Sequence, residues 1–176
     1  TGTWWVVAPE GLELASHIGN CLKDKGVQVV HIAPESRSGL AKSFEAQGSS
    51  PVAVICLTAL NESVCKDLPH VPAGFRNALR LVQALGDAQI QAPLWLMTQG
   101  AVSTGASELL RQPIQSLIWG LGRALGLERI DGTTKLLDLP ETMDTGAWSS
   151  VMDALDSNDH EDQMAIRGSA RWVRRL

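Results

Sequence analysis

Three closely spaced glycines are the residues of this 176-residue chain whose pattern most resembles a cofactor site. Gly120, Gly122 and Gly126 could cradle a dinucleotide pyrophosphate if the segment 116–119 were a strand and the glycines formed the turn after it. The apolar residues through this segment recur instead at helical spacing, as Ile114, Leu117, Ile118, Leu121 and Leu125. This pattern favours a helix that packs closely against a neighbour over a phosphate-binding loop.

A second possible dinucleotide turn follows the first apolar run of the chain. It reads Ala8-Pro9-Glu10-Gly11, with one glycine where a dinucleotide fingerprint requires several. The carboxylate of Glu10 would also repel a phosphate. We therefore expect no cofactor-binding residues here.

Candidate nucleophiles are equally weak. Ser103 lies in the sequence GAVSTG, which has one residue too many for the Gly-x-Ser-x-Gly turn of a serine hydrolase. Cys21 and Cys56 fall on faces that we expect to be buried, where a thiol is inert. No catalytic residue is expected from these patterns.

Metal sites are not indicated by the histidines or the acidic residues. His17 and Cys21 are four apart on an expected helix, but a second pair at ligand spacing is missing from the sequence. The acidic stretch 153–162 lacks the glycine and the spacing of a calcium loop. We expect a solvated turn there and no bound metal.

Charge and composition set further limits on function. The net charge of −4 argues against a nucleic-acid-binding protein, although Arg167, Arg171, Arg174 and Arg175 cluster near the end of the chain with Trp172 among them. Three cysteines without paired spacing indicate reduced thiols of a cytoplasmic protein. No apolar run approaches the length needed to cross a membrane.

The elements that would position such residues alternate between apolar strands and amphipathic helices. We expect strands over 4–8, 27–32, 52–57, 94–98 and 136–139, and two extended segments over 163–166 and 170–176. Helices are expected within 14–22, 75–85, 113–128 and 148–155, with a possible short one over 40–47 in a surface connection. The alternation predicts an α/β fold with a mainly parallel sheet and helices on both faces, most simply as one domain over residues 1–176.

The segment QPIQSLIWGLGRALGLE at 112–128, preceded by the strand and loop LWLMTQGA at 94–101, resembles the structural subdomain of a polyketide synthase ketoreductase. The opening GTWWVVAP and the closing EDQMAIRGSARWVRRL resemble the two ends of the same subdomain. The resemblance implies a truncated Rossmann-like fold. It also implies that NADPH binding and reduction of the β-ketoacyl chain belong to a separate catalytic subdomain.

Reduction in the manner of that family uses a tyrosine as the acid, together with a lysine and a serine. The chain contains no tyrosine, so the resemblance implies no catalytic residue here. We therefore expect a noncatalytic scaffold, the structural half of a ketoreductase region or of a pseudo-ketoreductase. Its partner would be the catalytic subdomain or a neighbouring modifying domain of the same synthase.

Two alternatives stay open at this point. The chain could be a reductase-like domain that binds NADPH by itself, for which the glycines of segment 120–126 would be the available loop. It could also be an association module that forms a homodimer through an apolar helix or through the arginine-rich edge strand.

Overall fold

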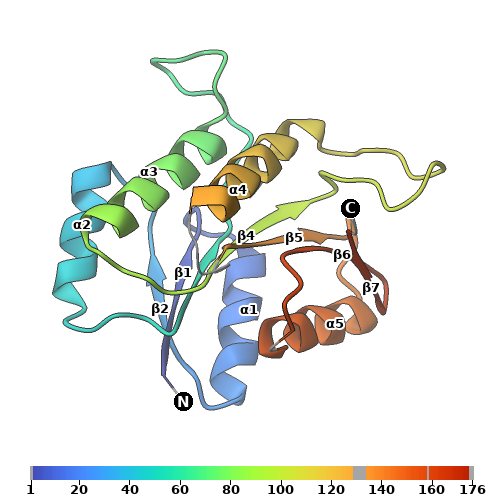
Figure 1. The fold of residues 1–176 in the computed structure, drawn as a ribbon, viewed down its shortest axis with the longest axis horizontal. Coiled ribbons are helices and arrows are strands. Elements are labelled where there is room, and N and C mark those ends of the chain that lie inside the picture. Colours follow the sequence, from blue (N-terminus) through green and yellow to red (C-terminus); the bar gives the residue numbers. More distant parts are fainter. Residues whose placement is uncertain (1, 129–133, 158, 175–176) are drawn as a thin grey trace. The chain divides into compact units, whose positions relative to one another are not determined.

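A computed structural model of the chain describes residues 2–128, 134–157 and 159–174. It confirms the α/β class, with a mostly parallel seven-stranded sheet and helices on both faces, a Rossmann-like fold (Figure 1). The chain divides into two compact units, residues 1–95 and residues 96–176. Each unit is described separately below.

The first unit is built around three parallel strands in the order β2-β1-β3. Its elements are β1 (Thr3–Val7), α1 (Glu13–Asp24), β2 (Gln28–Ile32), α2 (Arg37–Ala46), β3 (Ala53–Cys56), the 3-10 helix η1 (Thr58–Leu60) and α3 (Ala73–Asp87). Trp5 of β1 pairs with Val30 on one side and with Val54 on the other. Strand β3 is buried along its whole length, as its unbroken apolar sequence predicts.

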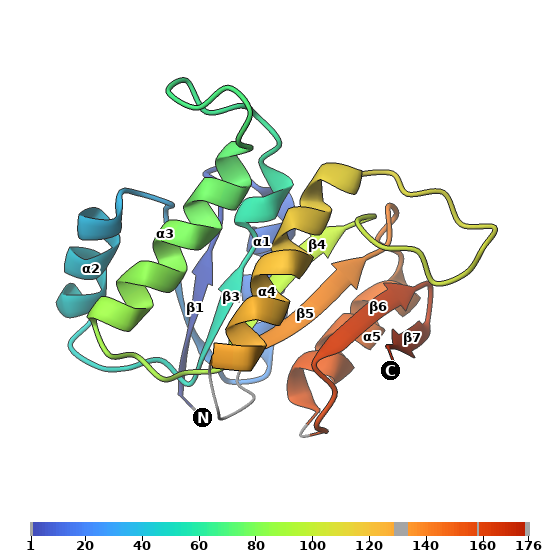
Figure 2. The ribbon, with the colours of Figure 1, turned by 45° about the horizontal axis from the view of Figure 1, so that its top comes forward.

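Helices cover both faces of these strands. Figure 2 shows α3 in front of β1 and β3, with α2 beside α3, and α1 behind the strands. The helix α2 begins at the cap residue Ser36, whose hydroxyl accepts a hydrogen bond from the Gly39 N–H. It buries Leu40 and Phe44, and the Phe44 ring stacks on Trp5 with 4.9 Å between the centroids. The possible short helix over 40–47 is therefore confirmed, although it begins three residues earlier, and its two buried apolar residues, one turn apart, anchor it to the strands.

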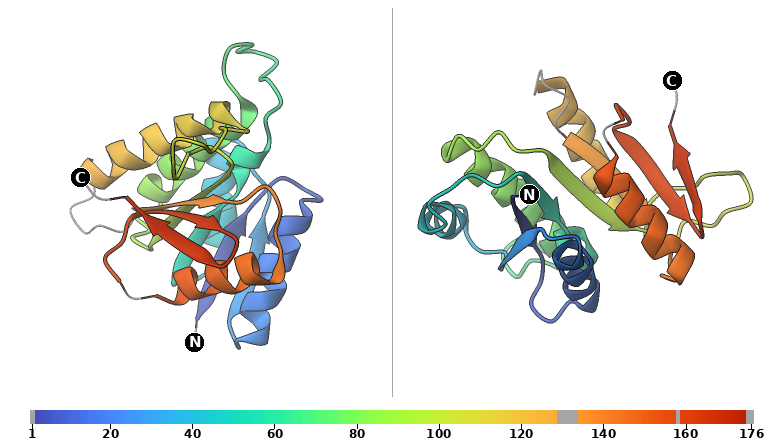
Figure 3. Two further views of the ribbon diagram at one scale, coloured as in Figure 1. Left: turned by 90° about the vertical axis from the view of Figure 1, so that its right-hand side faces the viewer. Right: turned by 90° about the horizontal axis from the view of Figure 1, so that it is seen from below.

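The second unit holds the rest of the sheet, in the order β4-β5-β6-β7. Its elements are β4 (Leu94–Gln99), of which the part from Leu96 on belongs to this unit, the 3-10 helix η2 (Pro113–Gln115), α4 (Ser116–Glu128), β5 (Thr134–Leu139), α5 (Thr145–Asp156), β6 (Gln163–Arg167) and β7 (Ala170–Val173). Strands β5 and β6 are parallel, and the two extended segments that the sequence predicts, β6 and β7, pair as an antiparallel hairpin. Helices α4 and α5 lie on opposite faces of these strands (Figure 3). Asp144 caps the N-terminus of α5, since its carboxylate accepts a hydrogen bond from the Ala147 N–H at 2.8 Å.

The glycine-rich segment is helical, so the alternative of a phosphate-binding loop at 120–126 is excluded by α4. Gly122 makes the close contact that the sequence predicts, because a methyl group there would lie 2.7 Å from Cδ2 of the buried Leu136. Around Gly120 and Gly126, a methyl group would meet no atom of the described chain within 4 Å. Close packing therefore explains one of the three glycines.

The apolar stripe expected on this helix is only partly buried. Ile118 and Leu125 are inside, whereas Ile114, Leu117 and Leu127 are exposed. The helix thus has two apolar faces, one on β5 and one open. We call the exposed apolar surface formed by Leu117 and Leu127 of α4, together with Ile114 of the preceding 3-10 helix η2, the open face of α4.

Candidate functional site

A chain of buried polar side chains in the second unit joins four of its elements. Trp119 of α4 donates from its indole Nε1 to the Thr98 hydroxyl at 3.0 Å, and Thr98 donates to Asp138 Oδ1 at 2.6 Å. The other oxygen of Asp138 accepts from Arg167 Nη2 at 2.8 Å. Thr98 and Asp138 are completely buried and the Arg167 side chain is 18% exposed. We call Trp119, Thr98, Asp138, Arg167 and the glutamate described next the buried polar network.

The network continues into the loop that follows β4. Arg167 forms an ion pair with Glu108 and donates to the Val102 carbonyl at 2.8 Å. Glu108 in turn accepts from the backbone N–H and the hydroxyl of Thr104, at 2.7 and 2.8 Å. Burial raises the pKa of Glu108, but the hydrogen bonds from Thr104 and the Arg167 guanidinium outweigh it, so the pKa lies below its ordinary value. Both carboxylates of the network are thus held by several donors, and through Arg167 they tie the loop after β4 to strands β5 and β6.

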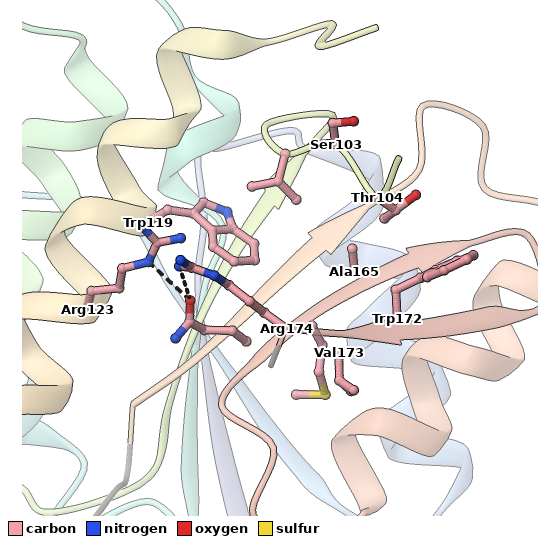
Figure 4. Close-up of a pocket in the computed structure, with 11 residues that line it drawn as sticks. Ser103, Thr104, Trp119, Arg123, Ala165, Trp172, Val173 and Arg174 are labelled. Atoms are coloured by element: carbon pink, nitrogen blue, oxygen red, sulfur yellow. Dashed lines mark hydrogen bonds between the residues drawn. The ribbon is translucent and has the colours of Figure 1, made fainter. Parts of the chain in front are cut away.

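Beside the network, the second unit has a cleft of about 340 Å³ on the face that carries α4. The cleft lies between α4, the loop after β4 and the hairpin of β6 and β7 (Figure 4). Its lining includes Thr104, Trp119, Arg123, Ala165, Trp172 and Arg174. The buried polar network fixes Trp119 on one side of this cleft and Thr104 on another.

Two arginines converge in the cleft on one neutral acceptor. Arg123 Nε lies 3.1 Å and Arg174 Nη1 lies 3.3 Å from the same Gln163 Oε1 (Figure 4). The Arg123 guanidinium also lies 5.9 Å from the centre of the Trp119 ring, within range of a cation–π interaction. Arg123 therefore turns toward the hairpin of β6 and β7.

Residues weighed as nucleophiles take structural places. The Ser103 hydroxyl donates to the Gly105 carbonyl at 2.5 Å within a loop, so the structure gives it no strand-to-helix turn. Cys56 and Cys65 are buried, and burial raises the pKa of the Cys56 thiol. The expectation of burial was wrong for Cys21, which is partly accessible because it lies at the margin of the inner face of α1.

The described candidates for a metal site and for a basic patch likewise do not lie together in the structure. Within residues 2–128, 134–157 and 159–174, the structure has no group of three histidines, cysteines or carboxylates placed to hold a metal. The arginines near the end of the chain do not form one basic patch. Arg171 Nη2 lies 2.7 Å from Asp159 Oδ2, Arg167 belongs to the buried polar network, and Arg174 lines the cleft. Arg175 lies outside the described residues. In the same part of the chain, no helix is long and apolar enough to cross a membrane.

One residue of the network has a signal in the sequence. Asp138 is a charged residue inside the apolar strand sequence TKLLDL, and a buried carboxylate requires partners. Those partners, Thr98 and Arg167, lie 40 and 29 residues away in the sequence and share no spacing with it. Arg123 and Trp172 lie 49 positions apart in the sequence, and only the fold brings them to one cleft.

Comparison with known proteins places the whole chain in one family. Residues 5–176 match the family described as the Rossmann fold domain of the polyketide synthase extender module SpnB. Polyketide synthase GfsA of Streptomyces halstedii is 43% identical over 186 aligned residues, which cover 100% of this chain and 2% of that protein. Erythronolide synthase EryA3 of Saccharopolyspora erythraea is 40% identical over 154 aligned residues, covering 82% of this chain and 5% of that protein.

Solved ketoreductases share the fold closely. A C2-type ketoreductase from a modular polyketide synthase has a TM-score of 0.89 at 35% identity, over 99% of this chain and 40% of that one. An A1-type ketoreductase has a TM-score of 0.86 at 35% identity, over 99% and 38% of the two chains. The chain thus spans well under half of the solved ketoreductases and a few per cent of the synthases that it matches.

Proposed function

Since the chain belongs to the family of Rossmann-fold domains of polyketide synthase extender modules, we propose that it is a noncatalytic scaffold of a ketoreductase region. In this role it stabilises and orients the part of that region that carries the chemistry, or a neighbouring modifying domain. The solved ketoreductases that it resembles are about two and a half times its length, which leaves room for such a partner in the same polypeptide.

The observation that carries this proposal is the open face of α4. Leu117 is 41% and Leu127 88% exposed, although a typical amphipathic helix of a globular protein turns its polar side to water. Apolar surface of this kind marks a site where another protein surface is buried. The occupant we propose is the remaining part of the ketoreductase region.

The chemistry of the chain supports the noncatalytic part of the proposal. The absence of tyrosine removes the acid that ketoreductases of this kind use, and the two carboxylates beside the cleft, Asp138 and Glu108, are engaged in the buried polar network. We expect no saturable binding when the chain is titrated with NADPH up to millimolar concentration and tryptophan emission is followed. Binding in the micromolar range would instead favour a cofactor-binding domain.

A fusion protein tests the scaffold role directly. This chain replaces the matching region of the A1-type ketoreductase, and reduction of a small ketone with NADPH is measured. We expect a soluble fusion with reductase activity, whereas the remaining region produced alone should aggregate or lack activity. A fusion that is no more soluble or active than the remaining region alone would contradict the scaffold role.

A substitution then tests the open face. Leu117→Asp should leave the unfolding midpoint of the isolated chain nearly unchanged, because the side chain is already exposed, but should disrupt the fusion. Leu79→Asp is the matched control, since Leu79 is exposed to a similar degree, 37%, on α3. Equal effects of the two substitutions on the fusion would exclude the open face of α4 as the specific contact. Sedimentation of the isolated chain across a concentration range shows whether a second copy covers this face instead.

A further inference from the structure

The two arginines of the cleft differ from most of the arginines that the structure describes, because neither has an acidic partner among the described residues. Five described arginines form ion pairs with carboxylates, namely Arg37, Arg76, Arg111, Arg167 and Arg171. Among the described residues, no carboxylate pairs with Arg123 or Arg174. This holds although acidic residues outnumber basic ones, 19 to 15, in the sequence.

The surroundings of these arginines add apolar surface to the positive charge. Trp172 is 50% exposed on the edge strand β7, and it pairs across the hairpin with the small residue Ala165. Figure 4 shows Ala165 between the ring of Trp172 and the arginines, and its small side chain leaves space in the cleft at that point. Trp119 forms the opposite wall and its indole N–H is already engaged with Thr98. The cleft therefore combines two positive groups with two aromatic surfaces.

We propose that this cleft binds an acidic segment of a protein partner, with a carboxylate seated between Arg123 and Arg174 and an apolar side chain against Trp172. Charge complementarity decides the occupant, because a carboxylate would replace the neutral oxygen of Gln163 as the acceptor of both guanidinium groups. The volume of about 340 Å³ suits one or two side chains better than a whole cofactor. The identity of the partner rests on the proposed function, which supplies it as the remaining part of the ketoreductase region.

The first test uses the isolated chain and two blocked peptides, acetyl-Leu-Asp-Glu-Leu-amide and its uncharged counterpart acetyl-Leu-Asn-Gln-Leu-amide. Side-chain N–H signals of Trp172, Arg123 and Arg174 are followed by NMR during each titration. We expect saturable shifts with the acidic peptide and binding about tenfold weaker with the uncharged one, as loss of one charge-assisted contact implies. Equal binding of the two peptides, or no shift at several millimolar, would overturn the proposal.

Variants localise the binding. The double variant Arg123→Gln, Arg174→Gln should lose about tenfold in affinity for the acidic peptide, and Trp172→Ala should weaken it through the apolar contact. Arg171→Gln is the matched control, because Arg171 lies on the same strand but pairs with Asp159 away from the cleft. Unfolding midpoints confirm that each variant is folded. If the double variant binds as the wild type does, the cleft is not the site.

Two further experiments distinguish a docking site for an acidic segment from a site for free anions, and identify the partner. Acetate and inorganic phosphate that shift the same signals as strongly as the acidic peptide would indicate a free-anion site and overturn the docking of a segment. In the ketoreductase fusion, loss of activity in the double variant but not in Arg171→Gln supports the partner named above. An active fusion that tolerates the double variant refutes the cleft contact and leaves the scaffold role standing. An inactive wild-type fusion refutes the scaffold role, while the peptide titration still decides the cleft.

Discussion

Replacing Arg167 by methionine should be the most informative single perturbation of the second unit. Arg167 compensates the buried carboxylate of Asp138 and ties the loop after β4 through Glu108 and the Val102 carbonyl. Methionine keeps much of the volume and removes every donor. Asp138 then stays buried with its remaining hydrogen bonds and without a positive partner.

The magnitude follows from burial. Removing one partner of a buried ion pair costs about 3–5 kcal/mol, because the other charge is left uncompensated in the interior. Arg167 is 18% exposed, and Asp138 keeps donors from Thr98 at 2.6 Å and from the Ala101 N–H at 2.9 Å. We therefore expect the low end of that range, about 3 kcal/mol of unfolding free energy for Arg167→Met. For a chain of this size the unfolding temperature should fall by roughly 6–12 °C.

Urea unfolding of the isolated chain, followed by circular dichroism and tryptophan emission, measures this loss. The midpoint should fall while the slope with urea stays constant, since the surface exposed on unfolding is unchanged. Arg171→Met is the control, because it breaks the partly exposed pair with Asp159, where about 1 kcal/mol or less is expected. In a double-mutant cycle, Asp138→Asn combined with Arg167→Met should cost at least about 1 kcal/mol less than the sum of the two single changes. A loss below about 1 kcal/mol for Arg167→Met, or an additive cycle, would refute the structural role assigned to the buried polar network.

Three further predictions concern single positions. Gly122→Ala should destabilise the chain by about 1 kcal/mol or more, because overpacking against Leu136 of β5 exceeds the gain in helix propensity. Gly126→Ala should stabilise the chain by up to about 1 kcal/mol, because the added methyl group meets no other atom of the described chain within 4 Å. Urea midpoints in the reverse order would contradict this packing. Because the folded-state pKa of Glu108 is lowered, its contribution is complete above the ordinary glutamate pKa and is lost as the pH falls below about 4. Glu108→Gln should therefore be less stable than the wild type at pH 7 and should lose less stability on acidification, and parallel stability curves over pH 2–7 would be the opposing result. With a thiol reagent at pH 8 we expect Cys21 to react first and Cys56 only on unfolding, and mass spectrometry of the labelled peptides would detect the reverse order.

The class of fold and the positions of most elements can be predicted from the amino-acid sequence alone. Local periodicity was sufficient for this, because a strand such as Ala53–Cys56 is apolar throughout and a helix such as Ala73–Asp87 repeats its apolar residues every three or four positions. Caps and turns were equally local, as Asp144 before α5 and the left-handed Gly26 after α1 illustrate. The absence of tyrosine was also a property of composition alone.

Which helix faces are buried, and which polar residues form hydrogen bonds with one another, depends on the tertiary structure. Periodicity marks an apolar face without saying what covers it, so the sequence could not show that Leu117 stays exposed while Gly122 packs against Leu136. The buried polar network and the two-arginine cleft depend on strand order, which places residues tens of positions apart on neighbouring strands. Hydrogen bonds such as that between Thr98 and Asp138 act over about 3 Å in space and leave no regular interval in the chain.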